Sequence, residues 1–299
     1  MPRLYVIGNG FDKHHRMPSG YDAFGRFVAH VDPNLFQTVS EFLFWDDDLW
    51  ADFEANLANI DEDAILDDAA NYLASYGDDD WSDDSHHSYQ RRIDEIVSAL
   101  SSDLRRHFVD WIRTLEPPAP GSGYHPANID PTALFLTFNY TPTLQRLYGV
   151  PERNVLHIHG RSSDAAADII LGHGWKRPAP RPTLNEEGEE VDERDTRIVE
   201  GENRIRRYFA DTFKPTEQIL KHHRAVFQGL GAINEVWVMG HSFAAVDLAY
   251  FAAIRDHVAP STTWRASFYK AEERDQFAEA LGGLGLIAPQ VELIRLEAF

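Results

Sequence analysis

An asparagine and two histidines follow apolar runs near the middle of the chain. Asn139 comes directly after Leu136-Thr-Phe138, and both histidines lie in Val155-Leu-His-Ile-His-Gly160. An asparagine amide can orient a water molecule or hold a sugar hydroxyl, and a histidine with a pKa near neutrality can act as a general base. Asn139 and His159 are therefore candidate catalytic residues. Asn139 could equally be a turn residue that caps the next helix.

Two further apolar runs end in glycine-bearing segments, Gly8-Asn-Gly-Phe-Asp12 and Gly240-His-Ser242. Glycine lets the backbone approach a ligand closely and lets consecutive N–H groups point at a phosphate. The first segment has Lys13 where a dinucleotide fingerprint has its third glycine, so a plain tight turn is an equal interpretation. Asp12 could hold a ribose hydroxyl or cap a helix, and Ser242 could bind a phosphate or ribose.

The histidines also allow metal chemistry. His157 and His159 are two apart on a predicted strand, so they are expected to share one face, and His173 could be a third ligand. No carboxylate stands at a familiar ligand spacing, and the prediction is that no metal is bound.

A serine hydrolase is a further alternative, because Gly240-His-Ser-Phe-Ala244 resembles a nucleophile elbow. A triad would need an aspartate and then a histidine after Ser242. The histidine that follows, His257, falls inside the next predicted helix and cannot readily fold back onto the serine.

These residues need a sheet to bring them together, because strands followed by polar turns place side chains at the carboxyl edge of an open α/β sheet. The apolar runs predict strands at 4–7, 133–138, 154–158, 169–171, 235–239, 265–269 and 291–296. Helices are predicted at 142–148, 203–230, 243–258 and 272–281. This alternation predicts an α/β fold with a mostly parallel, Rossmann-like sheet and helices on both faces.

The apolar spacing between about Pro33 and Glu116 is helical. The predicted domains are therefore an α/β nucleotide-binding domain of residues 1–32 and 131–299, and a helical insertion of residues 33–130.

The composition limits the partners. The net charge of −20 disfavours nucleic acid, whose phosphates attract basic surfaces. Cysteine is absent, which excludes disulfides and cysteine-ligated zinc. Neither a secretory signal nor an apolar run long enough to cross a membrane is found, so a cytoplasmic protein without membrane contact is expected.

Taken together, the motifs resemble those of the AbiH-type abortive infection proteins of bacteria. The resemblance rests on the number and order of Gly8-Asn-Gly-Phe-Asp12, Trp50-Ala-Asp-Phe-Glu54, Phe138-Asn-Tyr-Thr141, His157-Ile-His-Gly160, Leu171-Gly-His-Gly174, Phe213-Lys-Pro-Thr216, Met239-Gly-His-Ser242 and Asp247-Leu-Ala-Tyr250. That family in turn looks like a divergent branch of the sirtuin-like NAD-binding fold. The resemblance implies an antiphage effector that hydrolyses NAD at the nicotinamide–ribose bond, with NAD as substrate and no required cofactor.

The resemblance also implies roles for single residues. By the resemblance, Asn139 would face the nicotinamide ribose, His159 would be the catalytic histidine, and Gly8, Asn9, Gly10, Gly240 and Ser242 would bind the nucleotide. We further predict Asp12 as a third catalytic candidate, and Phe11, Gly160, His241 and Asp247 as nucleotide-binding residues. Sirtuins have an aspartate where this chain has Thr141, and their zinc ribbon needs cysteines, so deacylation is not expected.

Two alternatives stay open: a non-catalytic nucleotide sensor in a defence complex, and a metal-dependent nuclease or hydrolase that uses the histidines. A phage-derived trigger or a partner defence protein is expected. The acidic loops at 77–87 and 185–195 have no assigned role. The aromatic residues Phe42, Phe44, Trp45 and Trp81 could form an interface between copies of the chain, and burial in the helical region explains the first three equally well.

Overall fold

The computed structural model describes residues 2–43, 50, 52–73, 87–119, 127–164, 168–178, 195–286 and 289–299. Most of the two acidic loops, together with Phe44, Trp45 and Trp81, lies outside the described residues. The chain forms two compact units. The sheet unit comprises Met1–Phe24, Val109–Ile170 and Pro215–Phe299, and the helical unit comprises Gly25–Phe108 and Leu171–Lys214.

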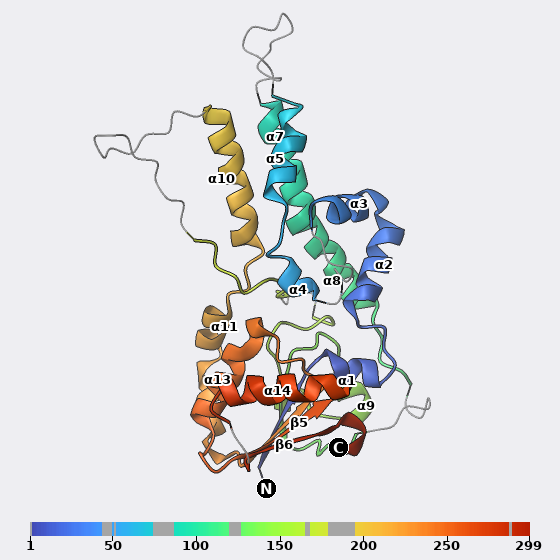
Figure 1. The fold of residues 1–299 in the computed structure, drawn as a ribbon. Helices are drawn as coiled ribbons and strands as arrows, with labels where there is room; N and C mark the ends of the chain where they lie inside the picture. Colours follow the sequence, from blue (N-terminus) through green and yellow to red (C-terminus); the bar gives the residue numbers. More distant parts are fainter. Residues whose placement is uncertain are drawn as a thin grey trace, which may run out of the picture. The chain divides into compact units, whose positions relative to one another are not determined.

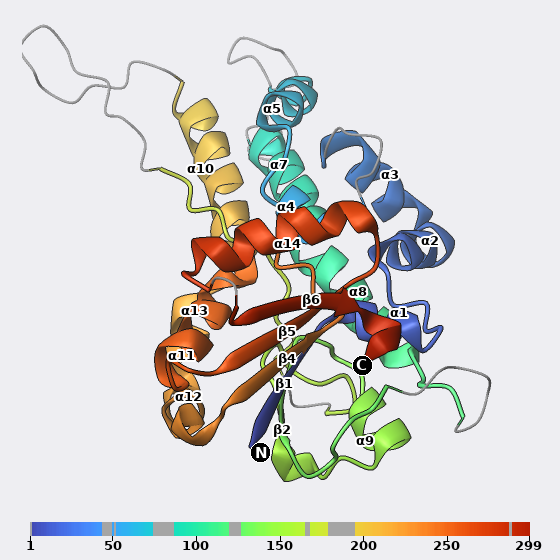
Figure 2. The same ribbon diagram turned by 60° about the horizontal axis from the view of Figure 1, so that its bottom comes forward.

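The sheet unit (Figure 1) is built on six parallel strands in the order β3-β2-β1-β4-β5-β6. Figure 2 labels β2, β1, β4, β5 and β6 in this order. The strands are β1 (Arg3–Ile7), β2 (Leu134–Thr137), β3 (Val155–His157), β4 (Glu235–Met239), β5 (Thr263–Phe268) and β6 (Val291–Arg295). The predicted Rossmann-like parallel sheet is confirmed, and its strand order is that of the six-stranded dinucleotide-binding fold. The strand predicted at 169–171 is wrong, because these residues form no strand; Ile170 N–H donates to the His159 carbonyl, and the Ile170 carbonyl accepts from the Tyr140 hydroxyl.

Side chains of the strands alternate between two cores. Helices pack on both of these cores, which confirms the prediction of helices on both faces of the sheet (Figure 2). Leu4 and Val6 pack on one face with α11 (Thr216–His222), α12 (Arg224–Gln228), α13 (Leu248–His257) and α14 (Ala271–Gly283). Tyr5 and Ile7 pack on the other face with α1 (Asn9–His14), α9 (Thr143–Tyr148) and the C-terminal turn η5 (Leu296–Ala298).

Two predicted helices differ from the structure. The single helix predicted at 203–230 is wrong: α10 (Thr196–Asp211) ends before Pro215, and α11 and α12 follow as separate helices. Proline restricts the residue before it to extended backbone, and Phe213 pairs with His173 in an isolated bridge. The helix predicted from residue 243 begins only at Leu248, after the 3₁₀ turn η4 (Ala245–Asp247).

The helical unit contains α3 (Pro33–Phe42), α4 (Phe53–Asn56), α5 (Glu62–Ala70), α7 (Ser88–Ser98), the π-helical turn η1 (Ala99–Asp103) and α10. Two helices, α2 (Tyr21–Val31) and α8 (Leu104–Thr114), have residues in both units. The apolar spacing thus predicted helices correctly, and the predicted domain limits stay predictions. Gly201 allows α10 to approach α7, since a Cβ there would lie 2.7 Å from side-chain atoms of Tyr89 and Ile93.

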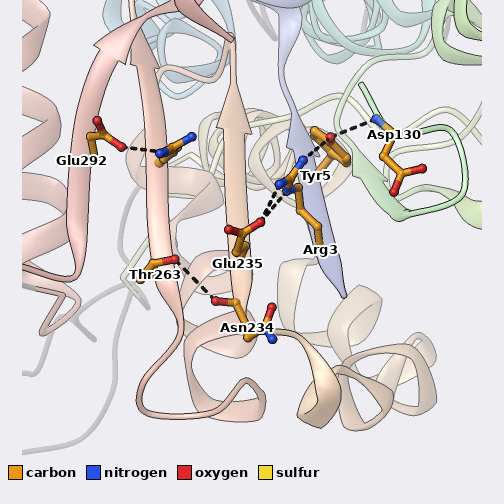
Figure 3. A network of polar contacts seen from close by, with 8 residues as sticks. Arg3, Tyr5, Asp130, Asn234, Glu235, Thr263 and Glu292 are labelled. Carbon is orange, nitrogen blue, oxygen red and sulfur yellow. Dashed lines mark hydrogen bonds and ion pairs between the residues drawn. The ribbon is translucent and has the colours of Figure 1, made fainter. Parts of the chain in front are cut away.

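Polar contacts at the amino ends of the strands tie the sheet together (Figure 3). The Nε and Nη2 atoms of Arg3 donate to Glu235 at 2.8 and 2.6 Å, and Nη1 donates to the Tyr5 hydroxyl at 2.9 Å. The Arg3 guanidinium also lies 3.6 Å from the ring centroid of Trp237. Arg3, Glu235 and Tyr5 are therefore paired with one another at the amino ends of β1 and β4.

Candidate functional site

The turns after β1 and β4 lie directly against each other at the carboxyl edge. Gly10 N–H donates to the Gly240 carbonyl at 2.7 Å. A Cβ at Gly8 would lie 2.6 Å from the Cα of His241, and a Cβ at Gly240 would lie 2.1 Å from the backbone nitrogen of Phe11. The packing of the two turns therefore explains these glycines without a ligand. The strand leads directly into α1, so Asn9 and Gly10 are helical and do not form a free turn.

A buried polar cluster joins α1 to the end of β2. Asp12, 1% exposed, accepts hydrogen bonds from Thr141 Oγ1 at 2.5 Å and from Thr143 Oγ1 at 2.7 Å. Burial raises the pKa of the Asp12 carboxyl and outweighs the two threonine hydroxyls and the Asn139 amide, which lower it. Asp12 is therefore a carboxyl group held in a nearly dry setting by two hydroxyl donors.

Replacing Asp12 by asparagine is expected to change how stability depends on pH. Because the pKa is raised on folding, the contribution of Asp12 to stability is complete below its unfolded pKa of about 3.9 and is lost as the pH rises through the folded pKa. Urea unfolding of wild type and Asp12→Asn between acidic and neutral pH should show the wild type losing stability relative to the variant. Parallel curves would contradict the raised pKa.

Asn139 is 7% exposed and lies two residues after the end of β2. Its backbone N–H donates to Thr137 Oγ1 at 3.0 Å, and its carbonyl accepts from His157 Nδ1 at 2.9 Å. The side-chain amide lies beside Asp12, but among the described residues neither Oδ1 nor Nδ2 makes a hydrogen bond of ordinary length and angle. The amide does not cap α9, which has Pro142 at its N-cap and no side-chain cap.

The prediction that His157 and His159 share one face is wrong, because β3 ends at His157 and the chain turns at Ile158 and His159. The His157 ring contacts the Asn139 carbonyl and, through Nε2, Gln145 Nε2 at 3.0 Å. Burial lowers the pKa of His157, which favours the neutral ring. His157 thus holds the backbone of Asn139, and it is not placed beside His159 as a metal pair.

His159 lies on the other side of the strand end, near His241 and Asp247. His159 Nε2 is 3.8 Å from Asp247 Oδ1, and His241 Nε2 is 3.6 Å from Asp247 Oδ2. The ring of Phe138 stands edge-on to both imidazoles, with centroid distances of 5.1 Å to His159 and 4.4 Å to His241. The structure therefore brings His159 together with two residues that were expected to bind nucleotide.

The remaining expected binding residues lie in varied settings. Asn9 Nδ2 donates to the Ser19 carbonyl at 2.8 Å, and Phe11 is fully buried in the core. Gly160 has φ +90°, and a Cβ there would lie 2.5 Å from the Asp168 carbonyl, so it serves the local loop. Ser242 is exposed at the turn after β4.

The serine hydrolase alternative gains no support from the histidine that follows Ser242. His257 Nδ1 lies 2.7 Å from the Ala253 carbonyl of its own helix, and it therefore serves as a donor there.

Sequence reasoning missed Thr143 and Gln145, whose side chains complete the contacts around Asp12 and His157. The sequence feature that could have indicated this cluster is the pair of threonine hydroxyls after β2, at positions 141 and 143. They are two apart, and both point at one carboxylate that lies far away in sequence.

Three other motifs meet inside the helical unit. Lys214 has a fully buried side chain and donates to Glu54 Oε2 at 2.6 Å. The backbone of His173 pairs with Thr212 and Lys214. These contacts give Glu54, Lys214 and the His173 backbone structural roles in the helical unit. No group of three or more histidine, aspartate or glutamate side chains placed to hold a metal is found in the described part of the chain. Within that part, no helix has the length and apolarity needed to cross a membrane.

The comparisons with known proteins agree with the motif order. The model of the family described as Bacteriophage abortive infection AbiH matches residues 4–268, a range that runs from β1 to the end of β5 and includes both polar clusters. No curated protein and no solved structure matches the chain. Because the family match covers most of the sequence, the chain belongs to the bacteriophage abortive infection AbiH family.

Proposed function

We propose that the sheet unit binds NAD, or a closely related nucleotide, at its carboxyl edge and hydrolyses the bond between nicotinamide and ribose. The family gives the chain a role in abortive infection. Loss of NAD would stop metabolism in an infected cell, and this is the kind of outcome that abortive infection requires.

The strand order supports a nucleotide site at this edge. In open α/β sheets, ligands bind outside the carboxyl ends of the strands where the strand order reverses. Here the reversal falls between β1 and β4, and Ile7 pairs with Met239 at the last position of both strands. Asp12 follows the first of these strands, and the exposed Ser242 follows the second.

The observation that carries the proposal is the Asn139 amide. A buried amide without hydrogen bonds costs about 1–3 kcal/mol, so it is retained where a ligand or a bound water completes it. Asn139 offers one acceptor and two donors beside the Asp12 carboxyl. A ribose diol, or a water aligned for attack, provides the matching donors and acceptors.

The position of Asp12 also fits the resemblance to sirtuins. Those enzymes have an aspartate two residues after the asparagine, where this chain has Thr141. The Thr141 hydroxyl bonds Asp12, so α1 supplies a carboxyl group next to the position that lacks one. We propose that Asp12 takes over that contact with the nicotinamide ribose.

The reaction needs little from the protein beyond positioning. The bonding pair of the glycosidic bond goes to the pyridinium nitrogen, so nicotinamide leaves as a neutral molecule and no strong general acid is needed. An oxocarbenium-like ribose forms, as in other glycosidic hydrolysis. Water adds to its C1′ carbon, and His159 accepts the proton that the water loses. The products are nicotinamide and ADP-ribose.

The test compares two asparagines. Purified wild type and the Asn139→Ala variant would be incubated with NAD, and nicotinamide release followed by chromatography. We expect Asn139→Ala to lose at least about 100-fold in rate, the effect of removing one positioned donor in an active site. Asn234→Ala is the matched control, because Asn234 also has an unpaired Oδ1 but lies at the amino ends of the strands (Figure 3).

The outcomes separate the remaining alternatives. Equal rates for Asn139→Ala and wild type would remove Asn139 from the site. NAD binding without release of nicotinamide would favour the nucleotide sensor, and loss of activity on chelation would favour a metal-dependent hydrolase.

A further inference from the structure

Asp247 lies between two histidines that come from different strand ends. Its Oδ1 is 3.8 Å from Nε2 of His159, and its Oδ2 is 3.6 Å from Nε2 of His241. All three side chains are largely buried, with exposed fractions of 3%, 4% and 11% for His159, His241 and Asp247. One carboxylate therefore faces two imidazoles in a setting where charge interactions are strong.

The protonation of His241 follows from its backbone contact. Phe243 N–H donates to His241 Nδ1 at 2.9 Å, and a backbone N–H can only donate. Nδ1 of His241 is therefore unprotonated, and the ring carries its proton on Nε2, which faces Asp247. Phe243 adopts φ +55° at this position, a conformation uncommon for a bulky residue.

His159 is the proposed base of the pair. Among the described residues, the titratable groups printed in contact with this pair are Asp247 at the end of η4, Tyr250 in α13 and the two histidines themselves. Of these, Asp247 is the carboxyl group, and its Oδ1 lies within ion-pair distance of His159 Nε2. A proton accepted by His159 would create an imidazolium whose Nε2 faces that carboxylate.

Asp247 occupies the N-cap position of α13, where an aspartate commonly accepts a hydrogen bond from the helix. Its side chain makes no capping bond there. The carboxylate is turned instead toward the two histidines.

We infer that Asp247 is a positioning residue, shared by His159 and His241, that orients His159 and stabilises its protonated form. This differs from the nucleotide-binding role that the sequence analysis predicts for Asp247 and His241. The effect of Asp247 on catalysis rests on the proposed function. The position of its carboxylate between His159 and His241 does not depend on which nucleotide is bound.

The Asp247→Asn variant removes the charge and keeps the shape. In this variant we expect the rate constant for nicotinamide release, kcat, to fall at least about tenfold while KM changes less than about threefold, because the interaction is made with the protonated base. The acid limb of the kcat–pH profile should move to lower pH by about one unit, since an opposite charge at this distance raises a histidine pKa by at least that amount. A large rise in KM at unchanged kcat would make Asp247 a nucleotide ligand and overturn the inference.

A second measurement does not need activity. The imidazole resonances of His159 and His241 would be followed by NMR against pH in the wild type, with assignments from His159→Gln and His241→Gln. The pKa of His159 should be lower in Asp247→Asn than in wild type by about one unit. Asp256→Asn is the control, because Asp256 is an exposed carboxylate of the same helix that pairs with Arg255.

The two measurements can fail separately. If wild type releases no nicotinamide, the proposed function fails, and the NMR comparison still decides the role of Asp247. The same His159 pKa in wild type and Asp247→Asn would overturn the inference. If Asp247→Asn does not fold, Asp247→Ser removes the charge with a smaller side chain and serves in the same comparison.

Discussion

Replacing His159 by alanine is expected to reduce the rate of nicotinamide release from NAD by about 10²–10⁴-fold, the contribution of a positioned general base. His159 lies at the end of β3, 2% exposed, with its ring next to Phe138, Tyr250 and the Asp247 carboxylate. Water attack on the ribose needs a proton acceptor, and among the predicted catalytic residues this is the imidazole.

The experiment needs a control for the loss of a buried ring. His159→Gln keeps polar atoms and much of the volume, and it should be as inactive as His159→Ala while retaining the thermal midpoint of the wild type more closely. His257→Ala is the matched control, because His257 contacts its own helix carbonyl and should leave the rate unchanged. A loss of less than about threefold in a folded His159 variant would exclude it as the base.

Replacing Gly240 by alanine is expected to lower the free energy of unfolding by about 3–5 kcal/mol, at the upper end of single substitutions. Two costs add at this position. Gly240 has φ +68°, which L-residues adopt at a cost of about 1–2 kcal/mol, and its added Cβ would lie 2.1 Å from the backbone nitrogen of Phe11. The clash is with backbone, so the turns after β1 and β4 would have to separate.

The Gly149→Ala variant measures the conformational cost without the steric cost. Gly149 has φ +64°, close to that of Gly240, but a Cβ there would meet no atom within 4 Å. Gly149→Ala should therefore cost only the conformational part, about 1–2 kcal/mol. Thermal and urea unfolding would give the free energy of unfolding of each variant. The difference between the two losses measures the steric cost of separating the turns after β1 and β4. If Gly240→Ala cost no more than Gly149→Ala, the close packing of the two turns would be contradicted.

The sheet could be predicted because its signal is local. Strands such as Glu235–Met239 are apolar runs bounded by turn residues, and burial on both faces requires that pattern. Alternation with helices then indicates parallel pairing. Proline chemistry indicates a helix end near Pro215. The apolar residues on both sides of Pro215 keep a helical spacing, however, and this spacing led to the prediction of one continuous helix.

The contacts of the site could not be predicted from spacing. Thr141 and Asp12 are 129 positions apart, and nothing in either segment says that a threonine hydroxyl will meet that carboxyl. Asp247 was expected to bind a nucleotide, because its place after the glycine turn did not show that η4 directs its side chain to two histidines. The error on His157 and His159 has the same origin, because the alternation of a strand holds only while the strand continues.

We propose that the sheet unit cleaves NAD by adding water to the ribose, and a time course of the products formed from NAD by purified wild type in ¹⁸O-labelled water distinguishes this reaction from others. We expect nicotinamide and ADP-ribose to appear in equal amounts, with the label in the C1′ hydroxyl of ADP-ribose. The proposal is wrong if NAD is neither bound nor consumed, or if it is consumed without release of nicotinamide.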